Sequence, residues 1–239
     1  AQESRGLGDV YKRQELIHAN EYVDVIVPRG GAGLIQFVVK NSTVPVIETG
    51  AGICHLYVDK DADLNKALTI AVNAKIQRPS VCNAIETILV HKDVADKFLP
   101  ELKKAFEKVE IKGDDATCQI IHCEHVTDDS YATEYDDYIV NIRVVDSVEE
   151  AINHIYTYST KHSESIITEN DETAVLFMNS LDSACVYHNA STRFSDGGEF
   201  GFGAELGIST QKLHARGPLG LKEMCSYQYK IEGNGQIRE

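Results

Sequence analysis

Strand-like and helical segments alternate along most of this 239-residue chain. Residues 55–58 and 85–90 are short apolar runs typical of buried strands, whereas residues 61–76 and 94–109 carry apolar side chains at helical spacing. The same alternation continues with strand-like residues 139–145, 165–168 and 184–187 and helical residues 148–158 and 172–181. Strands that alternate with helices are typical of a parallel sheet joined by crossover helices. The sequence therefore predicts an α/β fold with a largely parallel sheet flanked by helices.

Near the start of the chain, a strand-like segment leads into a glycine-rich turn. Residues 23–27 carry valine at alternate positions, Pro28-Arg29-Gly30-Gly31 follows them, and residues 34–40 predict a helix. Glycine lets a ligand approach the backbone closely, and N–H groups at a helix N-terminus bind phosphate. The turn is therefore a candidate phosphate cradle, and the alternative is a turn without a ligand.

The charge balance and composition exclude several classes of partner. The chain has 37 acidic and 23 basic residues, a formal net charge of −14, whereas binding to a nucleic-acid backbone needs a concentrated basic face. No apolar run approaches the ~18 to 20 residues that span a bilayer. The six cysteines lack the dense, regular spacing of a disulfide framework. We therefore expect a cytoplasmic enzyme with reduced thiols and without nucleic-acid or membrane partners.

Cys82 is the cysteine whose position most favours chemistry. It follows the polar, proline-containing residues 77–81 and precedes the strand-like residues 85–90, so its thiol lies at the polar mouth of a strand. A cysteine that only fills core space would more naturally lie inside such a strand. Partial exposure and the nearby Arg78 and Lys75 would favour the reactive thiolate. We interpret Cys82 as a candidate nucleophile, and the alternative is an inert buried thiol.

A second cysteine-containing segment runs from residue 118 to residue 125, with the sequence Cys-Gln-Ile-Ile-His-Cys-Glu-His. Its cysteines and histidines are four soft or borderline metal ligands within eight residues. The spacing lacks a Cys-x-x-Cys pair, and strand alternation would place the side chains on two faces. We therefore predict a strand and its exit here, and no metal site.

Three motifs in the chain resemble those of one enzyme family. Residues 77–83, Gln-Arg-Pro-Ser-Val-Cys-Asn, resemble the catalytic loop of γ-glutamyl phosphate reductase, also called glutamate-5-semialdehyde dehydrogenase, of the aldehyde dehydrogenase superfamily. Residues 189–218 and residues 27–33 resemble two further motifs of that family. The motifs stand in the family's order, and the resemblance covers roughly residues 20 to 238. It implies an aldehyde dehydrogenase-like catalytic domain and a truncated Rossmann-like cofactor domain.

The resemblance implies an NADP-dependent oxidoreductase of proline biosynthesis. In that family NADPH reduces L-glutamyl 5-phosphate to L-glutamate 5-semialdehyde, and phosphate is released. Cys82 stands at the position of the nucleophile: its thiolate attacks the acyl carbonyl and expels phosphate, and the thioacyl enzyme accepts hydride. The backbone N–H of Cys82 is the candidate donor to the oxyanion.

Cofactor-binding residues follow from the same resemblance. Arg29, Gly30 and Gly31 lie where the superfamily has its cofactor-binding turn, so we expect them to contact NADPH in an intact enzyme. Glu134 resembles the glutamate that holds the nicotinamide ribose, and the alternative for Glu134 is an acidic surface loop.

The substrate pocket is expected to include Ser191, Thr192 and Arg193. The two hydroxyls are candidate hydrogen-bond donors, and a guanidinium suits bidentate recognition of the substrate carboxylate. The alternative for Arg193 is a structural ion pair.

The resemblance also divides the chain into parts. We expect a leader unrelated to the family (1–14), a remnant of the NADPH-binding domain (15–50), the catalytic domain (51–210) and a C-terminal segment with an oligomerisation arm (211–239). Within that segment, residues 227–237 have strand character and resemble the arm that pairs across subunits in the family. Because members of the family are longer, we expect a fragment of a homo-oligomeric enzyme, weakly active or inactive alone. Glutamate 5-kinase is the candidate protein partner. Two alternatives stay open: an inactive fragment that keeps only subunit-interaction surfaces, and another aldehyde or acyl dehydrogenase.

Overall fold

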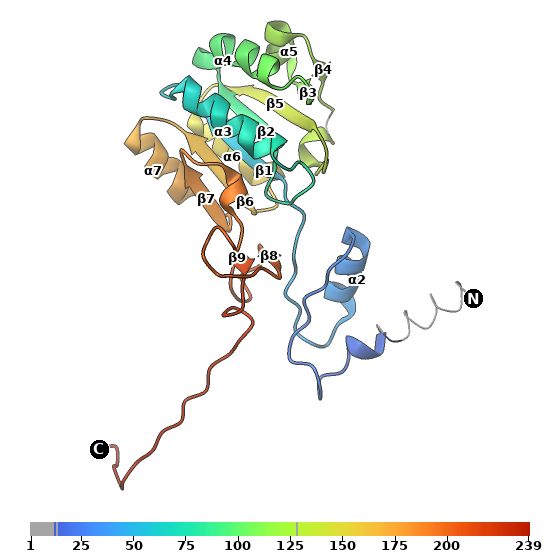
Figure 1. The fold of residues 1–239 in the computed structure, drawn as a ribbon, viewed down its shortest axis with the longest axis vertical. Coiled ribbons are helices and arrows are strands. Elements are labelled where there is room, and N and C mark those ends of the chain that lie inside the picture. Colours follow the sequence, from blue (N-terminus) through green and yellow to red (C-terminus); the bar gives the residue numbers. More distant parts are fainter. Residues whose placement is uncertain (1–11, 13, 128) are drawn as a thin grey trace, which may run out of the picture.

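A seven-stranded sheet forms the centre of the structure, a computed structural model that describes residues 12, 14–127 and 129–239. The strands lie in the order β4-β3-β5-β2-β1-β6-β7, and all neighbouring pairs run parallel (Figure 1). They are β1 (Cys54–Val58), β2 (Ile85–His91), β3 (Glu110–Gly113), β4 (Glu124–His125), β5 (Ile139–Val145), β6 (Ser163–Ile167) and β7 (Cys185–His188). The predicted α/β fold with a parallel sheet flanked by helices is confirmed. Residues 1–11 and 13 of the expected leader (1–14) lie outside the described residues.

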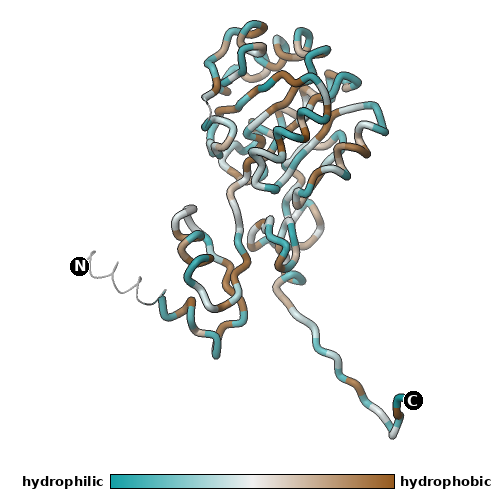
Figure 2. Tube along the Cα trace, turned by 180° about the vertical axis from the view of Figure 1, so that it is seen from behind, coloured by the Kyte–Doolittle hydropathy of each residue, from teal (hydrophilic) through white to brown (hydrophobic). Residues whose placement is uncertain are grey.

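Helices cover both faces of this sheet. Alternate side chains of each strand point to opposite faces, so apolar side chains are buried on both. In β1, Leu56 and Val58 join an apolar cluster with the first group of helices, whereas Tyr57 joins a second cluster with the other group. Figure 2 shows the apolar strands between the helical layers. The first group is α3 (Leu64–Ile76), α4 (Lys92–Ala105) and α5 (Asp115–Ile121), and the second is α6 (Val148–Tyr158) and α7 (Asp171–Ser180).

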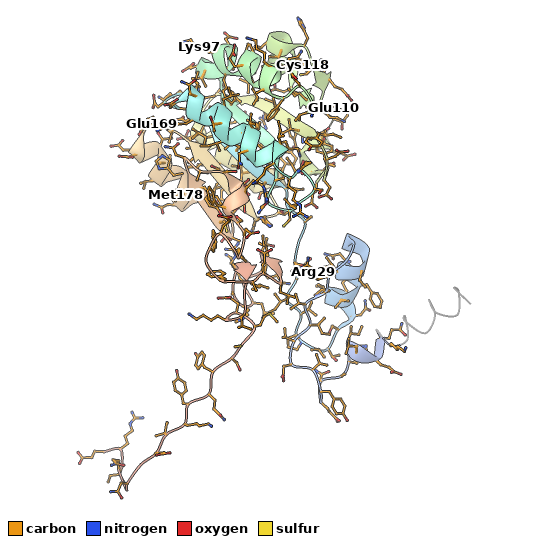
Figure 3. All side chains as sticks on the ribbon, in the orientation of Figure 1. Arg29, Lys97, Glu110, Cys118, Glu169 and Met178 are labelled. Atoms are coloured by element: carbon orange, nitrogen blue, oxygen red, sulfur yellow. The ribbon has the colours of Figure 1, made fainter. Side chains whose placement is uncertain are left out.

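Smaller elements complete the structure. They are α2 (Ala32–Asn41), the short 3-10 helices η1 (Ser130–Ala132) and η2 (Thr192–Phe194), and the antiparallel pair β8 (Gly207–Ser209) and β9 (Gly217–Leu219). Of these, α2, β8 and β9 lie below the main sheet in the view of Figure 1. An isolated bridge joins Thr49 to Ser209, and the Arg29 guanidinium donates to the Leu206 carbonyl. Figure 3 shows Arg29 beside this region, away from the helices of the main sheet. In the part of the chain that is described, no helix has the length and apolar character needed to cross a membrane.

The predicted strand over residues 118–125 is wrong for most of its length. Residues up to Ile121 belong to helix α5, and only Glu124–His125 form a strand. The side chain of Asp114 caps the helix by accepting from the Thr117 N–H at 2.9 Å, and His122 ends it in a left-handed conformation with φ 47°. An aspartate N-cap is a helix-start signal that outweighs the strand preference of the two following isoleucines.

Two further strand predictions differ from the structure. Residues 23–27 form no named strand and contribute only an isolated bridge between Ile26 and Val46. Residues 227–237 extend away from the rest of the chain and pair with none of its described strands (Figure 1). A strand needs a neighbour for its hydrogen bonds, so alternation of apolar residues alone is insufficient.

Candidate active site

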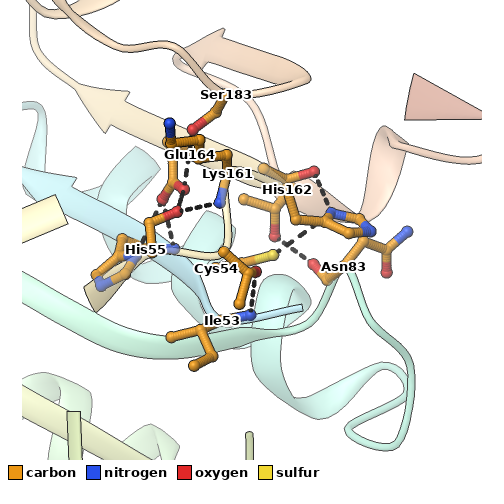
Figure 4. A network of polar contacts seen from close by, with 12 residues as sticks. Ile53, Cys54, His55, Asn83, Lys161, His162, Glu164 and Ser183 are labelled. Carbon is orange, nitrogen blue, oxygen red and sulfur yellow. Dashed lines mark hydrogen bonds and ion pairs between the residues drawn. The ribbon is translucent and has the colours of Figure 1, made fainter. Parts of the chain in front are cut away.

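The loops that enter four neighbouring strands meet at the amino edge of the sheet. Cys82 lies before β2 and Gly52 before β1. Glu134 lies before β5 and His162 before β6. These strands are adjacent in the order β5-β2-β1-β6 and run parallel, so their amino ends lie together. Figure 4 shows part of this edge, with Cys54 at the start of β1 facing His162.

Cys82 is partly exposed, and its peptide packs directly on Gly52. A Cβ atom at Gly52 would lie 1.5 Å from the Cys82 carbonyl oxygen, so only glycine fits there. The Gly52 N–H donates to Glu134 Oε1 at 2.6 Å, and the Cys54 thiol donates to the Cys82 carbonyl at 3.2 Å. The structure therefore brings Cys82 and Glu134, both predicted site residues, to the same glycine.

Residues in and next to η2 hold the cysteine loop from another side. Thr192 Oγ1 donates to the Asn83 carbonyl at 2.6 Å, and the Asn83 side-chain amide donates to the Ser195 carbonyl at 2.8 Å. Arg193 donates from Nη1 to Asn83 Oδ1 and from Nε to Gln77 Oε1 at 3.0 Å. Asn83, the residue that follows the cysteine, is thus fixed by two side chains and one backbone carbonyl.

The predicted substrate residues differ in what they face. Ser191 and Thr192 are buried, and both hydroxyls make hydrogen bonds within the protein: Ser191 Oγ accepts from the Arg193 N–H at 3.2 Å, and Thr192 donates to the Asn83 carbonyl. Arg193 is half-buried and lines a surface hollow of about 180 Å³. The other lining residues are Asn73, Gln77, Phe194, Asp196 and Glu199. Arg193 therefore borders open space at the surface, whereas the hydroxyls of Ser191 and Thr192 are engaged within the protein.

The predicted cofactor turn lies at the start of α2. Gly30 has φ 152°, a conformation that favours glycine. Gly31 is the N-cap of the helix and, as a glycine, has no side chain to bond the first backbone N–H groups. A Cβ atom at Gly31 would meet nothing within 4 Å. Arg29 donates to the carbonyl of Leu206, so this turn is joined to the segment that precedes β8.

Charges around Cys82 oppose its ionisation. Burial, followed by the carboxylates of Glu205 and Glu134, raises the pKa of the Cys82 thiol to about 11, even though Arg193 acts in the opposite direction. The thiol is therefore largely protonated at neutral pH in this chain. The expectation that neighbouring cations in the sequence favour the thiolate is wrong for Lys75.

Lys75 instead forms a buried ion pair with Glu86, the second residue of β2. The two side chains are almost fully buried, and Lys75 Nζ lies 2.9 Å from Glu86 Oε2. Burial raises the pKa of Glu86 to about 7 and lowers that of Lys75, and each partner opposes the shift of the other. Lys75 lies in the last turn of α3 and Glu86 near the start of β2, so the pair joins the two elements that flank the cysteine loop in the sequence.

Several residues of this site carry no local sequence signal. Gly52 precedes a strand as many turn glycines do, and Cys54 looks like any buried strand residue. Behind Cys54, His162 lies 3.6 Å from its sulfur, and a hydrogen bond of 2.9 Å joins His162 Nδ1 to Ser163 Oγ. Among the described residues, no group of three or more His, Cys, Asp or Glu side chains is arranged to hold a metal ion.

The raised pKa of Cys82 predicts a pH-dependent reaction with iodoacetamide. Only the thiolate is alkylated, so the rate at Cys82 should rise about tenfold for each pH unit below its pKa, without a plateau between about pH 7 and pH 10. Peptide mapping after timed quenching measures this rate. Glu205→Gln keeps the acceptor for the Gly197 N–H but removes a negative charge, so it should react faster at the same pH. A plateau below about pH 8 would contradict the account.

Substitutions at Thr192 test whether its hydroxyl stabilises the cysteine loop. Thr192→Val keeps the shape but leaves the buried Asn83 carbonyl without its donor, and it should lower the free energy of unfolding by about 1–3 kcal/mol. Thr192→Ser retains the hydroxyl and should recover most of this loss. Urea unfolding measures both. Equal stability of the Val and Ser variants would show that the hydrogen bond is not structural.

Known proteins resemble this chain in both sequence and structure. Residues 13–127 match the aldehyde dehydrogenase family. The γ-glutamyl phosphate reductase of Limosilactobacillus reuteri (strain DSM 20016) is 58% identical over 228 residues, which are 94% of this chain and 55% of the relative. That of Petrotoga mobilis is 60% identical over 226 residues, 94% of this chain and 54% of the relative. The crystal structure of the γ-glutamyl phosphate reductase of Thermotoga maritima has a TM-score of 0.91 and 52% identity, and the match covers 95% of this chain and 55% of that chain.

More distant structures share the fold alone. An acetylating aldehyde dehydrogenase from Geobacillus thermoglucosidasius is 16% identical with a TM-score of 0.68, and an engineered glycolyl-CoA reductase with bound NADP⁺ is 17% identical with a TM-score of 0.62. The chain therefore has the fold of the aldehyde dehydrogenase family. Over 94% of its length it is homologous to γ-glutamyl phosphate reductases, and it spans about half the length of the relatives it matches.

Proposed function

We propose that this chain supplies the catalytic cysteine and the substrate loops of a γ-glutamyl phosphate reductase, which reduces L-glutamyl 5-phosphate to L-glutamate 5-semialdehyde and releases phosphate. The observation that carries the proposal is the position of Cys82, whose partly exposed thiol lies where four loops meet. Gly52 and Cys54 contact its carbonyl, and Thr192 binds the carbonyl of the next residue, Asn83. The 58% identity to relatives of that name supports it.

The mechanism starts with the thiol of Cys82. After losing its proton to water, the sulfur attacks the acyl carbonyl, and the bond from that carbon to the phosphate oxygen breaks, so phosphate leaves and a thioester remains on Cys82. The backbone N–H of Cys82 is the proposed donor to the oxyanion. A nearby cation favours the thiolate, and Arg193 is the residue that lowers the pKa of Cys82.

The residues of the α2 turn fit a nicotinamide cofactor. Among the described residues no side chain caps the N-terminus of α2, and the Cβ position of Gly31 is open, so a phosphate has room at the backbone N–H groups. Gly30 and Gly31, with Arg29 beside them, would hold NADPH, and Glu134, through Oε2, would accept from a ribose hydroxyl. When bound, the cofactor supplies the hydride that reduces the thioester.

Arg193 is proposed to bind the carboxylate of the substrate. It lines the hollow next to the cysteine loop and presents a guanidinium with donors in a fork. Burial lowers the pKa of Arg193. The guanidinium is nevertheless charged at neutral pH, because arginine titrates far above that range. Asp196 and Glu199 on the same hollow are suited to the amino group of an amino-acid substrate.

The proposed partners follow from the chemistry and the exposed tail. The acyl phosphate must come from a kinase that phosphorylates the side-chain carboxyl of glutamate, so glutamate 5-kinase is the proposed partner. Within the proposed C-terminal segment (211–239), Tyr227, Tyr229 and Ile231 are 82%, 79% and 90% exposed. Such an apolar arm fits pairing with another copy of the chain in a homo-oligomer.

The test is reduction of NADP⁺ by glutamate 5-semialdehyde, with and without phosphate. The chain is assayed alone and mixed with the N-terminal half of the Thermotoga maritima relative, because it spans only about half of such enzymes. We expect phosphate-dependent activity in the mixture and little in the chain alone, since residues 15–50 are proposed to be only part of the cofactor domain. Activity that ignores phosphate would indicate another aldehyde dehydrogenase. No activity from a folded mixture would favour an inactive fragment.

A further inference from the structure

Two cysteines outside the proposed active site lie in contact. Cys118, in α5, and Cys123, just before β4, have their Sγ atoms 2.7 Å apart. A disulfide bond is about 2.05 Å long, so bond formation needs the sulfurs to approach by less than about 1 Å. Figure 3 shows Cys118 on α5, next to the edge strand β4. β3 and β5 separate β4 from β2, the strand that follows Cys82, so this pair takes no part in the proposed acyl transfer.

The turn between the two cysteines is fixed by its surroundings. His122 adopts φ 47°, and this left-handed residue turns the chain so that Cys123 comes back beside Cys118. Lys103 of α4 donates to the carbonyls of Ile121 and His122 at the end of α5. A Cβ at Gly113 would lie 2.6 Å from Cys123 Sγ, so glycine makes room for the sulfur. The folded chain therefore holds the two thiols together.

A small reagent has access to the pair. Cys123 is partly exposed, and Cys118 lines a surface hollow of about 400 Å³. The other lining residues are Asp115, Gln119, His122 and His125. The Cys118 thiol lies 3.3 to 3.5 Å from the carbonyls of Gly113, Cys123 and Glu124, which are uncharged partners.

We propose that Cys118 and Cys123 form a dithiol site that closes to an intrachain disulfide by exchange with a low-molecular-weight disulfide. The Cys123 thiolate attacks one sulfur of the reagent and releases one thiol, which leaves a mixed disulfide on Cys123. The Cys118 sulfur, after losing its proton to water, then attacks Cys123 Sγ and releases the second thiol. The chain loses two hydrogens and the reagent disulfide becomes two thiols, so the reaction is balanced.

The rate of this exchange depends on the fraction of Cys123 that is deprotonated. Burial and the neighbouring Cys118 thiol raise the pKa of Cys123 to about 12, Asp114 also raises it, and Lys103 lowers it. The thiolate fraction therefore grows with pH, and the exchange is best followed at mildly alkaline pH.

The test uses the full 239-residue chain and oxidised glutathione as the reagent. After treatment, free thiols are alkylated in acid-quenched, unfolded protein, and the tryptic peptide of residues 113–143 is weighed. We expect this peptide to escape alkylation and to lack the mass of two hydrogen atoms. Recovery of both cysteines in alkylated form, or of a lasting glutathione adduct on wild-type Cys123, would overturn the proposal.

Two variants separate the steps. In Cys118→Ser, Cys123 should keep a glutathione adduct, because its resolving thiol is absent. In Cys123→Ser, the buried Cys118 should stay largely unmodified. Circular dichroism confirms that each variant is folded. The two cysteines are also close in sequence, and the same treatment in urea is the control for this. The fraction of chains with a Cys118–Cys123 disulfide should fall when the fold is lost. An unchanged fraction would show that the fold does not build the site.

Discussion

Replacement of Cys82 with serine is expected to remove the phosphate-dependent reduction of NADP⁺ by the chain assembled with the N-terminal half of a relative. A serine hydroxyl is a much weaker nucleophile than a thiol at neutral pH, and loss of the nucleophile typically costs about 10³-fold or more in rate. The measurement is the initial rate with glutamate 5-semialdehyde and saturating phosphate, with circular dichroism to confirm that the variant is folded.

Cys225→Ser is the matched control for this substitution. Cys225 is exposed in the C-terminal segment and lies outside the cysteine loop, so its replacement should leave the rate unchanged. A Cys82→Ser variant that kept its rate within about tenfold of the parent would show that the nucleophile lies elsewhere.

Replacement of Lys75 with methionine is expected to destabilise the chain strongly. Methionine fills much of the same space, but it leaves the buried Glu86 without its cation, and loss of one partner of a buried ion pair typically costs about 3–5 kcal/mol. The free energy of unfolding in urea measures this loss. A double variant, Lys75→Met with Glu86→Leu, should recover much of it, because no uncompensated carboxyl is left in the core.

A surface lysine provides the control, and pH provides a second readout. Lys66 makes a 2.8 Å pair with Glu169 on the exposed face of α3, and Lys66→Met should barely change stability. The pKa of Glu86 is raised by folding, so its favourable contribution is present below its unfolded pKa and is lost as pH rises through about 7. The Lys75→Met deficit should therefore be smaller at about pH 5 than at about pH 8. A deficit independent of pH would mean that Lys75 stabilises the core by packing alone.

The sheet was largely predictable from the sequence because its signals are local. The helix expected over residues 61–76 is α3 (Leu64–Ile76), and the strand expected over residues 165–168 overlaps β6 (Ser163–Ile167). Strand prediction failed at Ile120 and Ile121, whose β-branched side chains favour strands, because the Asp114 cap starts a helix there. Residues 227–237, which also have strand character, pair with none of the described strands of this chain.

The active-site contacts were only partly predictable. Cys82 could be placed at the mouth of a strand, since the loop and strand are neighbours in sequence. The contact of Cys82 with Gly52, the bond from Gly52 to Glu134 and the bond from Thr192 to Asn83 depend on which strands lie side by side. The interacting residues are far apart along the chain. The same distance explains the error for Lys75: sequence proximity suggested a partner for the cysteine, but the fold turns the lysine toward Glu86.

The most direct test of the proposed function is to look for the thioester itself. Glutamate, ATP and a glutamate 5-kinase generate L-glutamyl 5-phosphate in the presence of this chain, and the protein is acid-quenched, digested and weighed. We expect a glutamyl group on the tryptic peptide that contains Cys82, absent from Cys82→Ser and from samples without kinase. An unmodified Cys82 in folded protein, while the kinase demonstrably forms its product, would contradict the account.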